Sequence, residues 1–185
     1  MTVWLARHAQ PLIASGVCYG ATDVPADAAA TRLAAKALAQ VLPQSILLRS
    51  STLQRCVQLT QTLLALRPDL TCTFDARLTE MDFGGWEGQR WDALPQAELA
   101  RWTADFAQHA CGGAESVAGF MQRVAAVWDE QTERGQDAVW ITHAGVIRAA
   151  QLLAKGLREI HRADQWPHDA PAFGQWCCVE APAQA

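Results

Sequence analysis

One stretch decides the fold class: Ala138-Val139-Trp140-Ile141-Thr142-His143-Ala144-Gly145, a nearly continuous apolar run that ends at a histidine. A short run of this kind is typical of a strand that is buried on both faces, as in a parallel sheet. The residues that follow, Gly145–Ala154, predict a helix that begins directly after the histidine. Together they indicate an α/β protein whose sheet is covered by helices.

Further strands and helices alternate along the chain around this stretch. We expect strands at Thr2–Ala6, Ser45–Leu48 (short enough to be ambiguous), Thr71–Phe74 and Gln175–Glu180. We expect helices from an Asp27 cap to about Leu42, from a Ser51 or Thr52 cap to Pro68, over Trp91–Phe106, and from Ser116 to about Glu133. The glycine-containing segment Arg77–Gln89 predicts a loop. The alternation indicates a largely parallel sheet covered on both faces, in a single domain over residues 1–185.

The composition excludes several classes of protein. The 185 residues are half hydrophobic, which suits one domain with a substantial core. A formal net charge of −4 and only 18% charged residues argue against a nucleic-acid partner. No apolar run approaches the roughly 20 residues that a membrane span requires, so we expect no membrane partner.

The six cysteines do not indicate a disulfide framework or a zinc site. They lie inside apolar patterns and show no paired Cys-x-x-Cys spacing. No signal peptide precedes them, so the expected location is the cytoplasm. No residues show the spacing of metal ligands, and the sequence predicts neither a metal nor a cofactor. The oligomeric state is left open.

Two histidines follow predicted strand ends. His8 comes after Arg7 at the end of the first strand, and His143 follows the strand quoted above. Ligands of open α/β sheets bind outside the carboxyl ends of the strands, so we expect both histidines to face one pocket. Arg55, in the first turn of a helix after a third strand, adds a second guanidinium, and such groups suit phosphoryl oxygens. The N–H groups of the helix after Gly145 suit the same anion.

This pattern points to phosphoryl transfer through His8. A neutral imidazole can attack phosphorus without first losing a proton, and the phosphoramidate that forms can later be hydrolysed. The leaving alkoxide needs a proton, and Glu80 in the predicted loop is the best candidate for the acid. Asp82, Glu87 and Glu115 stay open as alternative acids.

Four blocks of the sequence resemble the motifs of one known family. They are Leu5-Ala6-Arg7-His8-Ala9-Gln10, Ser50-Ser51-Thr52-Leu53-Gln54-Arg55-Cys56, Leu78-Thr79-Glu80-Met81-Asp82-Phe83-Gly84-Gly85-Trp86-Glu87-Gly88 and Thr142-His143-Ala144-Gly145. In this order they resemble the histidine phosphatase superfamily, the phosphoglycerate-mutase-like clan. The resemblance covers roughly Val3 to Ala150.

The resemblance implies a fold and a set of roles. The fold is a three-layer αβα sandwich with a mostly parallel central sheet. His8 is the residue that becomes phosphorylated, and Glu80 is the proton donor. Arg7, Arg55 and His143 form the phosphate pocket. The expected activity is that of a phosphomonoesterase with a covalent phosphohistidine intermediate.

A narrower resemblance concerns the segment after the first histidine. Gly16–Pro25 is similar to the short branch that contains the α-ribazole phosphatases of cobalamin synthesis. The chain departs from the family pattern at Ala9, where glycine is usual, at Pro11, where threonine is usual, and in lacking the asparagine often found shortly afterwards. That asparagine is a phosphate ligand in many members. The Ser15 hydroxyl or the Gly20 backbone N–H are the candidates to replace it.

Two alternative functions remain open at this point. A mutase would move phosphate within a phosphoglycerate through the same phosphohistidine. Mutases of the clan carry a longer insert with extra basic residues between the acid and the second histidine, whereas Trp91–Gly113 offers only Arg101. A non-catalytic phosphate-binding module is disfavoured because His8 and His143 are both present. We therefore expect the ligand to be a small-molecule phosphate ester.

Overall fold

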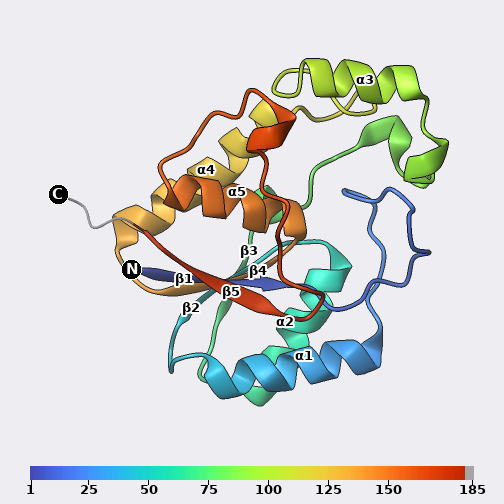
Figure 1. Cartoon of the computed structure of the whole chain (residues 1–185). Helices are drawn as coiled ribbons and strands as arrows, with labels where there is room; N and C mark the ends of the chain where they lie inside the picture. Colours follow the sequence, from blue (N-terminus) through green and yellow to red (C-terminus); the bar gives the residue numbers. More distant parts are fainter. Residues whose placement is uncertain (182–185) are drawn as a thin grey trace.

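A central sheet organises the fold. The computed structural model describes residues 1–181, so the last four residues of the domain predicted over 1–185 lie outside it. In this part of the chain the sheet has five strands in the order β3-β2-β4-β1-β5 (Figure 1). The strands are β1 (Thr2–Arg7), β2 (Leu47–Ser50), β3 (Cys72–Phe74), β4 (Ala138–Thr142) and β5 (Trp176–Glu180). Only β5 is antiparallel, to β1, and the predicted α/β class is confirmed.

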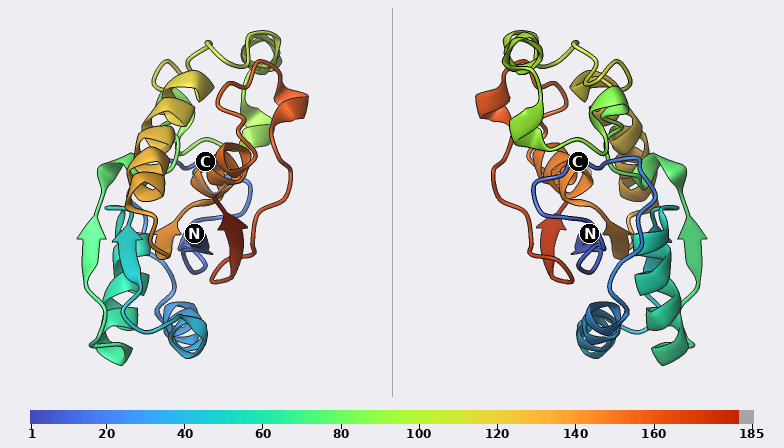
Figure 2. Two further views of the ribbon diagram at one scale, coloured as in Figure 1. Left: turned by 90° about the vertical axis from the view of Figure 1, so that its left-hand side faces the viewer. Right: turned by 90° about the vertical axis from the view of Figure 1, so that its right-hand side faces the viewer.

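Helices cover both faces of this sheet. They are α1 (Ala28–Val41), α2 (Gln54–Leu66), α3 (Gln96–Ala104), α4 (Val117–Arg134) and α5 (Ala144–Ala154). Helices α1 and α2 pack on one face and α4 and α5 on the other, which gives the predicted αβα sandwich (Figure 1). Helix α3 lies apart from the strands in both views of Figure 2. No helix within residues 1–181 has the length and apolar character that a bilayer span would need.

The surroundings of β4 explain why this strand is almost entirely apolar. Ala138 and Trp140 belong to the core beneath α4 and α5, whereas Val139 and Ile141 belong to the core beneath α1 and α2. All five residues of β4 are buried. A strand with both faces covered favours apolar side chains on both, and this confirms the expectation from the quoted stretch.

The predicted strand Ser45–Leu48 is shifted in the structure. Strand β2 covers Leu47–Ser50, in register with β4 from Leu47 opposite Ala138. Ser45 has a φ of 54°, which belongs to a turn and not to a strand. The polar Arg49 can lie in the strand because its guanidinium pairs with Glu130 at 3.0 Å.

Two helix predictions were wrong in their bounds. The expected helix Trp91–Phe106 is divided into a single 3₁₀ turn, Trp91–Ala93, and α3. Pro95 separates them, because a proline disfavours the helical conformation at the residue before it. The predicted cap of α2 at Ser51 or Thr52 is also wrong, since α2 follows Leu53 without a side-chain cap.

The predicted cap of α1 is confirmed and gives a test of the fold. The Asp27 side chain accepts a hydrogen bond from the Ala30 N–H at 2.7 Å. Replacing Asp27 with alanine should lower the free energy of unfolding by about 1 kcal/mol, because the N–H loses its partner. Urea denaturation measures this change. Asp27→Asn keeps an acceptor and should stay close to wild type; equal losses in both variants would contradict the capping role.

Candidate active site

The two predicted histidines lie side by side at the carboxyl edge of the sheet. His8 follows β1 and His143 follows β4, and these strands are paired so that Arg7 lies opposite Thr142. The backbone N–H of His8 donates to the carbonyl oxygen of Thr142 at 3.0 Å. The two imidazole centroids are 5.1 Å apart, and both rings are buried. Strand pairing therefore brings together two residues that are far apart in the sequence.

The contacts of His8 leave one ring nitrogen with a free lone pair. Nδ1 lies 2.7 Å from the carbonyl oxygen of Ala9, which can only accept, so Nδ1 carries the proton and Nε2 does not. Burial lowers the pKa of His8 to about 3, and the nearby charges of Arg55 and Arg7 act in the same direction. At neutral pH the imidazole is therefore uncharged and its Nε2 can act as a nucleophile.

Arg55 brings a buried positive charge to the histidines. It is fully buried and donates to the carbonyl oxygens of Thr22 at 2.8 Å and Gly20 at 2.7 Å. Its Nε donates to His143 Nδ1 at 3.3 Å. All three acceptors are neutral, and within residues 1–181 no carboxylate forms an ion pair with Arg55. The charge is left available for an anion.

Arg7 adds a second guanidinium with an unused donor. Its Nη1 donates to the Pro171 carbonyl oxygen at 3.0 Å, and its guanidinium carbon lies 3.9 Å from the centroid of the Phe173 ring. Its Nε is buried and has no partner among the described residues. Burial lowers the pKa of Arg7, which reflects the cost of holding this cation away from water. A bound oxyanion would offset that cost and accept from the free N–H.

Both nitrogens of His143 are held by protein groups. Since Arg55 donates to Nδ1, the proton of the neutral ring lies on Nε2, which is 2.8 Å from Ser51 Oγ. Burial lowers the pKa of His143 well below its usual value, and His8 and Arg55 add to the effect. The sequence assigned Ser51 to a helix cap and missed this contact. In the structure, His143 is hydrogen-bonded to both Ser51 and Arg55. Its expected role in holding phosphate stays a prediction.

Glu80 reaches the start of α5, beside His143. Its Oε2 accepts from the Gly145 N–H at 3.0 Å, and its Oε1 accepts from the Met81 N–H at 3.1 Å. A Cβ at Gly145 would lie 2.2 Å from Glu80 Oε1, so this contact requires glycine. The predicted anion-binding helix start therefore holds the Glu80 carboxylate through Gly145.

Two residues that sequence reasoning missed hold the Glu80 loop in place. Arg123 of α4 donates to the carbonyl oxygens of Thr79 at 2.7 Å and Glu80 at 3.0 Å. Thr142 of β4 donates through its hydroxyl to the carbonyl oxygen of Leu78 at 2.8 Å. Neither residue shows a local sequence signal, because each acts through a segment distant in the chain.

The alternative acids are engaged elsewhere. Glu87 accepts from the backbone N–H of Thr22 at 2.6 Å, Glu115 pairs with Arg123 at 2.6 Å, and Asp82 accepts from a backbone N–H two residues on. Within the described residues none of the three carboxylates hydrogen-bonds to His8 or His143. Of the four carboxylates, Glu80 is the one held at the start of α5.

The two candidates to replace the missing asparagine as a phosphate ligand, Ser15 and Gly20, differ in burial. Ser15 is exposed, its carbonyl oxygen accepts from Arg90 at 3.3 Å, and no hydrogen bond described here links it to the histidines. Gly20 is buried and presents its carbonyl oxygen to Arg55. Its N–H as a phosphate ligand stays a prediction, as does the Ser15 hydroxyl. Within residues 1–181 no three His, Cys, Asp or Glu side chains gather closely enough to hold a metal ion.

The same arrangement of blocks is found in a known family. Residues 3–173 match the family model described as the histidine phosphatase superfamily, branch 1. The chain belongs to the histidine phosphatase superfamily. No curated protein gave a match. The matched residues include both histidines and the Glu80 loop.

Solved structures of this superfamily share the fold. TTHB049 from Thermus thermophilus is 28% identical, with 98% of this chain and 95% of that chain covered and a TM-score of 0.73. A candidate α-ribazole-5′-P phosphatase from Escherichia coli is 24% identical over 96% of this chain and 89% of that chain, with a TM-score of 0.80. Mycobacterial glucosyl-3-phosphoglycerate phosphatase is 24% identical over 97% of this chain and 89% of that chain, with a TM-score of 0.77. The last two likenesses show the fold alone.

The buried histidines predict how the stability of the folded chain depends on pH. The pKa of His8 is about 3 in the folded chain and about 6.5 when the ring is exposed, so the unfolded state binds a proton that the folded state does not. Stability should therefore fall as pH falls from about 6.5. Between pH 6 and 5 this residue alone should remove about 1 kcal/mol.

Urea denaturation at pH 6 and pH 5 tests this prediction with two variants. His8→Asn should lose about 1 kcal/mol of the pH dependence. His161→Asn, at a side chain that is mostly exposed to water, is the matched control. An unchanged slope in His8→Asn would show that the ring is charged in the folded protein.

Proposed function

We propose that the chain is a phosphomonoesterase that acts through a covalent phosphohistidine at His8. The observation that supports this most directly is the neutral His8 ring beside two guanidinium groups, the buried Arg55 and the half-buried Arg7, which form no ion pair with a carboxylate among the described residues. A phosphate monoester supplies the missing negative charge and the oxygens that guanidinium groups bind in pairs. Family membership supports the same class of reaction.

The proposed reaction has two steps. In the first, His8 Nε2 attacks phosphorus, the bond from phosphorus to the leaving oxygen breaks, and that oxygen takes a proton from Glu80. In the second, water attacks the phosphohistidine, the Glu80 carboxylate accepts the proton of that water, and the N–P bond breaks. Inorganic phosphate leaves, and both side chains return to their starting states.

Hydrolysis is favoured over transfer within a phosphoglycerate. A mutase has to hold a small acidic substrate close to the phosphohistidine. Arg101, the basic residue of Trp91–Gly113, donates from its Nε to the carbonyl oxygen of Ala97 in its own helix and is exposed. It is therefore poorly placed to hold a substrate carboxylate.

We further propose an α-ribazole 5′-phosphate type of ester as the substrate to test first. The segment Gly16–Pro25 supports this choice through its likeness to that branch. In the structure its residues Gly20 and Thr22 accept hydrogen bonds from Arg55, so the segment forms one wall of the anion site. Within the superfamily the substrate of such a site depends on the groups beyond the phosphate.

The phosphohistidine predicts a covalent adduct that can be trapped. Wild-type protein mixed with a ³²P-labelled ester and quenched in base should carry an acid-labile, base-stable label on His8. His8→Ala should lose at least about 10⁴-fold of kcat, while the far-UV circular dichroism stays that of the folded chain. His161→Ala is the matched control and should keep its activity. Label on another residue, or near-normal turnover by His8→Ala, would overturn the mechanism.

The role of Glu80 predicts a dependence on the leaving group. A ribose 5-phosphate leaves as an alkoxide that needs a proton, whereas para-nitrophenolate leaves unaided. Glu80→Gln should therefore slow ribose 5-phosphate hydrolysis by about 10²–10⁴-fold and para-nitrophenyl phosphate far less. Equal losses on both esters would indicate positioning instead of acid catalysis. If neither rate changes, Asp82, Glu87 and Glu115 become the residues to replace.

A further inference from the structure

A second feature of the structure borders Glu80. A cavity of about 270 Å³ opens there, with Glu80 and Gly145 in its wall. The other residues that line it include five with large aromatic rings: Phe83, Trp102, Phe106, Phe120 and Trp166. The Trp102 and Phe106 ring centroids are 5.3 Å apart, and Trp166 lies 6.3 Å from Phe106 and 6.2 Å from Phe120. The rings thus line a continuous apolar surface.

The place of this cavity ties it to the ester that reacts at His8. Gly145 donates to Glu80 within the cavity wall and is two residues from His143. If Glu80 protonates the leaving oxygen, the carbon atoms attached to that oxygen lie near Glu80, on the side of the oxygen away from phosphorus. Two cavities among the described residues have Glu80 in their walls. The other one is lined by charged groups such as Asp82, Glu115 and Arg123, so the aromatic cavity is the one that suits an apolar leaving group.

The wall also contains two hydrogen-bond donors that no described residue satisfies. The indole N–H of Trp102 is buried without a partner. Arg148 donates from Nη2 to the His168 carbonyl oxygen at 2.9 Å, but its Nε is likewise buried and unpaired. A buried donor without an acceptor is costly, so an oxygen or nitrogen acceptor on a ligand would be favoured here.

We propose that this cavity selects phosphate esters whose leaving group carries a neutral, flat ring system with a hydrogen-bond acceptor. The proposal rests on the proposed phosphomonoesterase function. Aromatic side chains attract rings in offset or edge-to-face contact, beyond the burial of apolar area. The volume lies just below the range for drug-sized ligands, about 300–1,000 Å³, and suits one or two fused rings. A carboxylate would be opposed by the apolar walls and by Glu80 itself.

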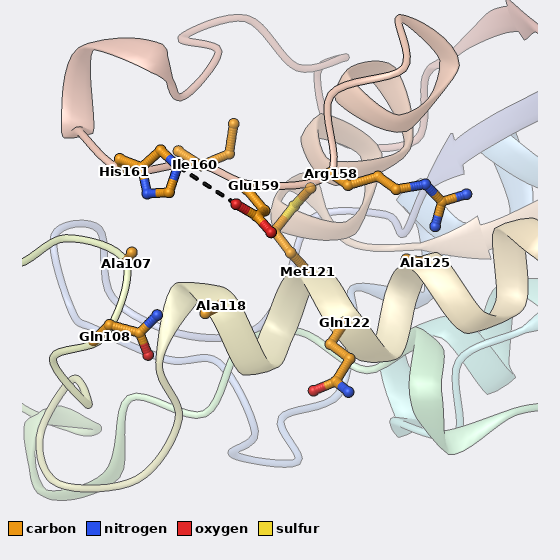
Figure 3. A pocket seen from close by; sticks show the side chains of 10 residues that line it. All are labelled: Ala107, Gln108, Ala118, Met121, Gln122, Ala125, Arg158, Glu159, Ile160 and His161. Atoms are coloured by element: carbon orange, nitrogen blue, oxygen red, sulfur yellow. Dashed lines mark ion pairs between the residues drawn. The ribbon is translucent and has the colours of Figure 1, made fainter.

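A larger cavity elsewhere provides the control. It has a volume of about 400 Å³ and lies between α4 and the segment Arg158–His161 (Figure 3). Gln108 lies at its edge, and the Glu159–His161 ion pair borders it. None of the residues that line it belongs to the site around His8. A substitution there should leave the reaction unchanged.

The test compares two esters that both release a primary alkoxide, 2-naphthylmethyl phosphate and methyl phosphate. Wild type should show a kcat/KM at least about 10-fold higher for the naphthylmethyl ester. Thr103→Trp, at an exposed position of the cavity wall, should fill the space and lower that ratio about 10-fold, with methyl phosphate hydrolysis unchanged. Trp102→Ala should lower the ratio in the same direction, whereas Gln108→Trp should leave it unchanged.

A binding measurement separates this proposal from the phosphatase function. Calorimetric titration with the product alcohol, 2-naphthylmethanol, should show binding to wild type and to Gln108→Trp, with at least about 10-fold weaker binding to Thr103→Trp. If the alcohol binds in this pattern but neither ester is hydrolysed, the cavity inference stands and the proposed function fails. If both esters are hydrolysed with equal kcat/KM in all variants, the cavity inference is overturned and the function stands.

Discussion

A buried guanidinium without a carboxylate partner is the constraint on which the rest of the site depends. Removing a charge from water costs several kcal/mol unless other groups compensate it. For Arg55 this cost is offset only in part, by hydrogen bonds to the carbonyl oxygens of Gly20 and Thr22 and to the ring of His143. These neutral acceptors fix the orientation of the guanidinium but do not neutralise its charge. The fold thus holds a cation in place for an anion that comes from outside the chain.

The same charge determines the state of both histidines. Burial and the nearby Arg55 each favour the neutral form of His8 and of His143. A neutral His8 keeps its Nε2 lone pair, while a neutral His143 can accept from Arg55 and donate to Ser51. The electrostatics that preserve the nucleophile also penalise the folded state in acid. Function and stability are opposed at this point of the molecule.

Local signals in the sequence were enough for the framework but not for the supports of the site. The apolar run of β4, the cap at Asp27, the helix start at Ser116 and the two strand-end histidines depend on neighbours within a few residues, and all could be predicted. The start of β2 could not, because its register is set by pairing with β4. The contacts of Ser51 with His143 and of Arg123 with the Glu80 loop cross 92 and 43 residues, respectively, so no short window contains them.

The anion site and the part of the cavity wall that α3 forms belong to different parts of the fold, and this has a consequence for specificity. His8, Arg55 and His143 follow or pack against central elements of the sandwich, where a change of side chain disturbs the core. Helix α3, which carries Trp102 and Thr103, contains no buried residue and lies apart from the strands (Figure 2). Its surface can change at little cost in stability. The wall residues on α3 can therefore vary among related chains while the chemistry at His8 stays the same.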